Sequence, residues 1–127
     1  MNKNIVLTAA VFGVMAVILG AFGAHSLKES IGEPALATWT KGVEYQFYHV
    51  FALLFLSNIK VETRLTRLAH LFFSLGIIFF SGSLYLLATR AIHQLEFASY
   101  IGPITPIGGL FFILGWMMLF FTAAKKQ

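Results

Sequence analysis

The side chains able to transfer protons or bind a ligand gather on one predicted helix, around Glu44, Tyr45 and His49. At 100° per residue these three share one broad helix face, and Gln46 falls about 140° from Lys41, at the edge of that face. Lys41 and Glu44 are spaced to pair at i,i+3, and Tyr45 and His49 to hydrogen-bond at i,i+4. Such a face either carries protons or a solute, or forms a polar network that only fixes how helices pair.

Metal and nucleophilic chemistry find little support in the pattern of residues. His25, Glu44 and His49 are metal-ligand types, but no His-x-x-x-His or Glu-x-x-His pair puts two ligands on one helix face, and no haem pair is predicted either. Ser81 and Ser83 are candidate nucleophiles, yet the chain holds no cysteine, no Asp and no G-x-S-x-G elbow. No metal, cofactor or catalytic residue is therefore predicted, and nothing in the sequence demands an enzyme.

The bulk composition indicates that most of the chain has lipid as its solvent. Hydrophobic residues make up 58% of the sequence and charged residues 11%, with a mean hydropathy of +0.82, whereas a soluble domain carries roughly 25% charged residues. Apolar stretches of roughly 20 residues are long enough to cross the hydrocarbon core. They predict an all-α integral membrane four-helix bundle in one domain, 1–127, with spans at about 5–25, 40–59, 68–89 and 106–124.

The segments between the predicted spans carry their own signals. The first outer loop holds residues 26–33 and then Pro34, and the second, 91–105, predicts a short helix lying at the membrane interface. Thr105 and Pro106 are typical of an N-cap followed by the first residue of a helix.

The basic residues orient the chain in the membrane. Six Lys and Arg fall on one side and three on the other, so the positive-inside rule predicts that both termini are cytoplasmic. The larger set is Lys3, Lys60, Arg64, Arg67, Lys125 and Lys126, and the smaller set is Lys28, Lys41 and Arg90. No basic run with interleaved aromatics is present, so nucleic acid is not a predicted partner. The predicted location is the bacterial inner (plasma) membrane, crossed several times.

The depth of each residue along its helix groups the polar side chains. A rise of 1.5 Å per residue puts them in the outer half of the bundle and leaves an inner half of Leu, Ile, Phe and Val, with His70 and His93 meeting water at helix ends. Lipid offers no hydrogen-bond partner, so the cluster should face the interior. The predicted cluster is His25, Glu44, Tyr45, Gln46, His49, Ser81, Ser83, Tyr85 and Thr105.

Small residues predict where helix backbones approach closely. Ala16, Gly20 and Ala24 recur at four-residue spacing on the first span. The full set of predicted packing residues is Gly13, Gly20, Gly23, Ala24, Gly82, Gly108 and Gly109.

Several of these stretches, spread over all four spans, resemble one known family. They are residues 20–25, Trp39 with 42–49, 80–85, 105–109 and 115–116. In them the chain resembles the small membrane proteins classed as domain of unknown function 423, also known as an uncharacterised inner-membrane protein family. The resemblance implies four spans in the bacterial inner membrane and adds Gly20, Gly23 and Trp116 to the residues of interest. It implies no activity, substrate or cofactor.

Three functions are compatible with this sequence. The first is an accessory or structural membrane protein that binds another membrane protein or a second copy of itself. The second is transport or conduction of a small solute or proton by an oligomer. The third is a lipid- or quinone-binding protein or enzyme with its site in the outer half. A dry, satisfied network favours the first, a file of water reaching the cytoplasm the second, and an ordered ligand beside His25, Tyr45 and His49 the third.

Overall fold

The chain is helical wherever its structure is described. A computed structural model describes residues 1–94 and 98–125, and no strand occurs among them. The long helices are α1 (Lys3–Phe22), α2 (Lys28–Ser57), α3 (Arg64–Gly76), α4 (Gly82–Ala88) and α7 (Ile104–Ala124). Two π-helical turns, η1 (Gly23–Leu27) and η2 (Ile77–Ser81), join α1 to α2 and α3 to α4, and two short helices, α5 (Arg90–His93) and α6 (Ala98–Ile101), precede α7.

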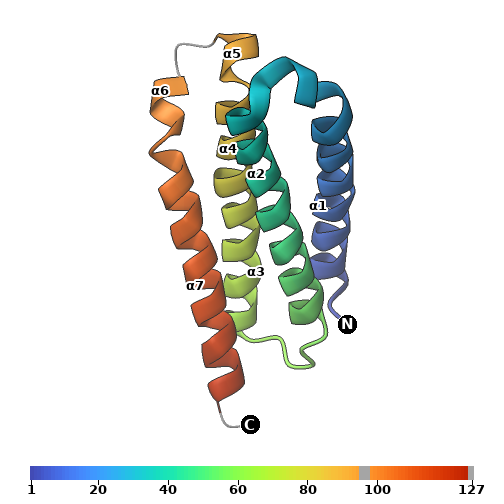
Figure 1. The fold of residues 1–127 in the computed structure, drawn as a ribbon. Helices are drawn as coiled ribbons and strands as arrows, with labels where there is room; N and C mark the ends of the chain where they lie inside the picture. The colour runs from blue at the N-terminus through green and yellow to red at the C-terminus, as the bar shows by residue number, and fades with distance from the viewer. Residues whose placement is uncertain (95–97, 126–127) are drawn as a thin grey trace.

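Three helical stretches of the described chain are long and apolar enough to cross a membrane: Lys3–Ser57, Arg64–Ala88 and Ile104–Ala124. The first has 55 residues, far more than the roughly 20 that one crossing needs. Figure 1 shows that this stretch doubles back, so that α2 returns alongside α1. The second stretch joins α3, η2 and α4 into one continuous rod.

The doubling back is built into a few residues rather than a loop. The predicted outer loop at 26–33 is helical except at Gly32, whose φ of 74° lies in the region that favours glycine. Pro34 follows two residues later, where the first turn of a renewed helix has no need of a backbone donor. Helix therefore continues through nearly all of the segment that the sequence predicted as a loop.

Each apolar helical stretch packs on the one that follows it in the chain, and the first also packs on itself where it doubles back. In order, α1 packs on α2, α2 packs on α4 and η2, and α3 packs on α7. The larger core lies towards the end of the molecule where α1 begins and α7 ends. Its fully buried residues include Leu53, Leu56, Ala69 and Phe73. A smaller core of Leu27, Trp39 and Ala88 closes the opposite end.

Several glycines mark the closest approaches between helices. A Cβ at Gly108 would meet the backbone of Phe80, and one at Gly23 would meet the indole of Trp39. Gly13, Gly20 and Gly109 would make contacts of 3.6, 3.3 and 3.9 Å with Val50, Val43 and Phe80. By contrast, nothing lies within 4 Å of a Cβ at Gly82, and Ala24 is exposed. Gly82 follows η2 and Ala24 lies in η1, where the wider π-helical turn shifts the four-residue spacing.

Candidate functional site: a closed polar network

Gln46 is the centre of the buried polar side chains and is 1% exposed. Its Nε2 donates to the carbonyl of Phe12 in α1 at 2.8 Å, and its Oε1 accepts from the Tyr85 hydroxyl in α4 at 2.7 Å. One side chain thus connects α2 to two other helices. The helical wheel had put Gln46 at the edge of the polar face, but α1 packs on that edge and encloses it.

His49 is held from three directions and is 5% exposed. Its Nδ1 lies 2.7 Å from the Tyr45 carbonyl, and its Nε2 lies 3.2 Å from the indole nitrogen of Trp116. Its ring stacks on Phe112 with centroids 3.5 Å apart and planes 7° apart. The interaction predicted between the side chains of Tyr45 and His49 is replaced by this bond to the Tyr45 backbone, while the Tyr45 ring packs on Phe80 at 4.8 Å.

These bonds define the protonation state of His49. A carbonyl oxygen only accepts, so Nδ1 carries the proton; an indole N–H only donates, so Nε2 is bare. The tautomer is inferred from these partners. A neutral imidazole satisfies both bonds, and a second proton would break the bond to Trp116. Both ring nitrogens are therefore engaged, and neither is free to bind a metal or a haem or to relay a proton.

Short hydroxyl bonds extend the network between helices. Ser81 donates to the Gly42 carbonyl of α2 at 2.7 Å, and Ser83 in α4 lies 2.6 Å from the Thr105 hydroxyl in α7. The Trp39 indole donates to the Leu19 carbonyl of α1 at 2.9 Å. Thr105 was predicted as the N-cap of the last helix; α7 instead begins at Ile104, and the threonine hydroxyl faces Ser83.

Two predicted members lie outside the network, and a third, Tyr45, joins it only through its backbone carbonyl. Glu44 is half-exposed and pairs with Lys41 at 3.6 Å on the surface of α2, while His25 in η1 is exposed. The buried stripe of α2 runs through Gly42, Gln46 and His49, and Glu44 lies about 200° around the helix from Gly42. The carboxylate is therefore on the opposite side of the helix.

The sequence did not predict a polar contact in the inner half of the bundle, which was expected to be apolar. His70 Nε2 in α3 lies 3.1 Å from the Thr8 hydroxyl in α1, and Asn2 donates to Glu62 at 3.2 Å. His70 had been assigned to water at a helix end. Thr8 and His70 each lie a turn or two inside their helices, and this matching depth was the available signal.

The network as a whole closes on itself. Among the described residues, every buried side-chain nitrogen and oxygen has a hydrogen-bond partner. No group of three or more His, Asp or Glu side chains that could hold a metal occurs in that part of the chain. The arrangement can therefore join helices, and it offers no unsatisfied group to a ligand.

Known proteins are similar to this chain over nearly its whole length. The family model described as "Protein of unknown function (DUF423)" matches residues 19–109, which include Gln46, His49 and Tyr85. The chain belongs to this family. The resemblance found in the sequence is therefore confirmed, although Trp116, the partner of His49, lies beyond the matched region.

Relatives in the family carry membrane-protein names. A UPF0382 membrane protein of Staphylococcus aureus is 43% identical over 97% of each chain. YwdK of Bacillus subtilis, another UPF0382 membrane protein, is 39% identical over 97% of this chain and 98% of its own. The UPF0382 inner membrane protein YgdD of Escherichia coli is 34% identical over 99% of this chain and 93% of its own. No solved structure matches the sequence. Together with its long apolar helices, these relatives identify the chain as a multi-pass integral membrane protein.

Proposed function

We propose that the chain crosses the membrane four times as a helix bundle, with both termini in the cytoplasm. The first apolar stretch doubles back at η1 and Gly32, which supports two crossings within 55 residues. The beginning of α1 and the end of α7 lie at the same end of the molecule (Figure 1). The six-to-three distribution of Lys and Arg, which includes Lys126 outside the described residues, supports a cytoplasmic position for that end.

Cysteine labelling tests this topology, because the chain has no cysteine of its own. Glu29→Cys should react in intact cells with a maleimide that cannot cross the inner membrane, whereas Lys60→Cys should react only after that membrane is permeabilised. Both residues are exposed, so access to the reagent is set by the side of the membrane. Labelling of both variants in intact cells, or of neither, contradicts four crossings.

We infer that the protein acts as an accessory or structural membrane protein, through contacts of its outer surface with another membrane protein or with a second copy. The closed polar network carries this inference, because each of its buried groups already has a partner within the chain. Four helices enclose little space, and the network leaves none of its groups free for a substrate.

The same observation argues against conduction. A proton path needs groups that can gain and lose a proton and exchange partners, whereas both nitrogens of His49 are engaged. On the side of His49 towards Ser57, the interior is filled by Leu53, Leu56 and Phe73. These side chains offer water no hydrogen-bond partner.

Proton flux into vesicles tests the inferred function. Vesicles that hold the protein and a pH-sensitive dye should acidify, under an imposed pH gradient, at the rate of protein-free vesicles. His49→Gln should behave identically, since its amide keeps hydrogen bonds but cannot carry a proton. A second reconstitution at a high protein-to-lipid ratio tests whether an oligomer conducts. Flux well above the protein-free rate that His49→Gln abolishes would establish conduction and overturn the inference.

A further inference from the structure

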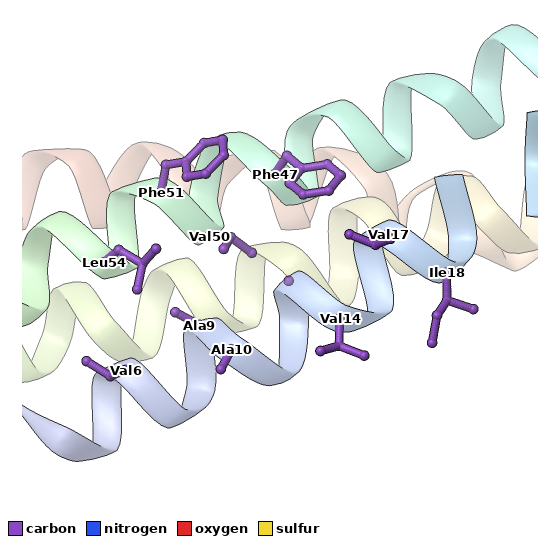
Figure 2. A pocket seen from close by; sticks show the side chains of 11 residues that line it. Val6, Ala9, Ala10, Val14, Val17, Ile18, Phe47, Val50, Phe51 and Leu54 are labelled. Carbon is purple, nitrogen blue, oxygen red and sulfur yellow. The ribbon is translucent and has the colours of Figure 1, made fainter. Parts of the chain in front are cut away.

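Two hollows lie along the seam between α1 and α2, and neither is lined by Gln46, His49 or Tyr85. The larger, about 540 Å³, is lined by apolar side chains of residues 6–18 and 47–54 (Figure 2). The smaller, about 360 Å³, is lined by Gly20, Gly23 and Ala24 and by α2 residues between Leu36 and Val43. The α2 residues that line the two hollows recur every three or four positions: Leu36, Trp39, Thr40, Val43, Phe47, Val50, Phe51 and Leu54. This spacing puts both hollows on one helix face, as a single groove.

The two ends of this α1–α2 groove differ in polarity. Around Ala10 and Val14 its lining is apolar, while Lys28 and Thr40 line the other end. Lys28 makes no ion pair among the described residues. The carboxylates of Glu33 and Glu44 line a separate hollow, beyond Leu36 and Thr40. The groove thus carries an unpaired ammonium group at one end of a hydrocarbon-lined channel.

We propose that the α1–α2 groove binds one glycerophospholipid, with an acyl chain along its apolar part and the phosphate at Lys28. From Ala10 to Ala24 the helix rises about 21 Å, which exceeds the roughly 15 Å of hydrocarbon in one leaflet. A second copy of α1 fits less well, because Lys3–Phe22 contains no acidic residue to pair with Lys28. The lipid site goes beyond the accessory role and does not depend on it.

Native mass spectrometry of the purified protein, titrated with dioleoyl phosphatidylglycerol, tests the proposal. The first lipid to bind should have a lower apparent Kd than any further lipid. Lys28→Gln should raise its apparent Kd about fivefold, the effect of one basic residue at an anionic lipid. Arg90→Gln is the matched control, since it removes another exposed charge near the same end of the molecule and should leave the Kd unchanged.

A second pair of variants tests the acyl-chain part of the groove. Ala10 is exposed and lines the larger hollow, so Ala10→Leu should fill it and abolish the single tight adduct. Val11 is 60% exposed and does not line the groove, so Val11→Leu should bind as the unaltered protein does. Thermal unfolding of each variant in detergent should stay unchanged, because none of these side chains is buried.

Three results would overturn the proposal. Equal lipid binding by all four variants would mean that lipid binds elsewhere. Binding of glycerol 3-phosphate with the same dependence on Lys28 would mean that the acyl chain plays no part. A dimer that Ala10→Leu dissociates, in place of the lipid adduct, would make a second copy the occupant. None of these results changes the expected absence of proton flux.

Discussion

Gly108→Ala is expected to destabilise the protein by about 3 kcal/mol or more, the upper range for overpacking a buried site. The added methyl group would meet the backbone of Phe80, in η2, and a backbone cannot rotate out of the way as a side chain can. Either α7 must move away from η2, or the helix must distort. Both changes would also pull Thr105 away from Ser83.

Gly109→Ala, at the very next residue, is the control for this substitution. A Cβ there would lie 3.9 Å from the Phe80 ring, an ordinary contact, and alanine favours helix over glycine by about 1 kcal/mol. The two variants should therefore differ in sign or differ severalfold in unfolding by sodium dodecyl sulfate, followed by circular dichroism in mixed micelles. Equal losses would contradict a backbone contact between α7 and η2 at Gly108.

Gln46→Leu is expected to cost about 1–3 kcal/mol, although leucine has a similar size and suits an apolar interior. The substitution removes the donor to the Phe12 carbonyl and the acceptor of the Tyr85 hydroxyl together. The Tyr85 hydroxyl is then left unpaired in a part-buried position, and a stranded donor costs more than a formed bond contributes.

The same unfolding measurement checks this prediction. Tyr48→Phe removes a hydroxyl from an exposed tyrosine of the same helix and should change the stability by less than about 0.5 kcal/mol. A Gln46→Leu protein as stable as the Tyr48→Phe protein would mean that water or lipid replaces both bonds.

Composition and span length correctly predicted the helical class and the membrane as solvent, since both depend on the number and run length of apolar residues. The family was also recognisable, because its short stretches are spread over the whole chain. The packing details were less accessible. No residue pattern in 23–27 or 77–81 predicts a π-helical turn. These turns nevertheless determine on which side of the helix the following residues lie.

The polar residues show the limit of a single-helix argument. The helical wheel of α2 groups Glu44 with Tyr45 and His49 on one face, which was expected to point inward, and it puts Gln46 at the edge of that face. The prediction for Glu44 was wrong, while Gln46 does face the interior and lies at its centre, because the interior side of α2 is set by where α1 and α4 pack. Glu44 needs no interior partner, since it pairs with Lys41 at the surface.

Trp116 and Thr8 illustrate the same limit. The Trp116 indole N–H needs an acceptor in a membrane interior, and the Thr8 hydroxyl, which donates to the Asn4 carbonyl of its own helix, can still accept a bond; in both cases the second residue comes from a helix far away in sequence. Only the pairing of helices identifies His49 and His70 as those partners.

The buried polar side chains work as pairs that hold the helices together. The double-mutant cycle of Gln46→Leu and Tyr85→Phe measures one such pair directly, through the unfolding free energies of the two single variants and the double variant. The closed network predicts that the double variant loses less than the sum of the single losses, by about 0.6 kcal/mol or more, the average for hydrogen bonds between membrane helices. Additive losses, within about 0.3 kcal/mol, would contradict it.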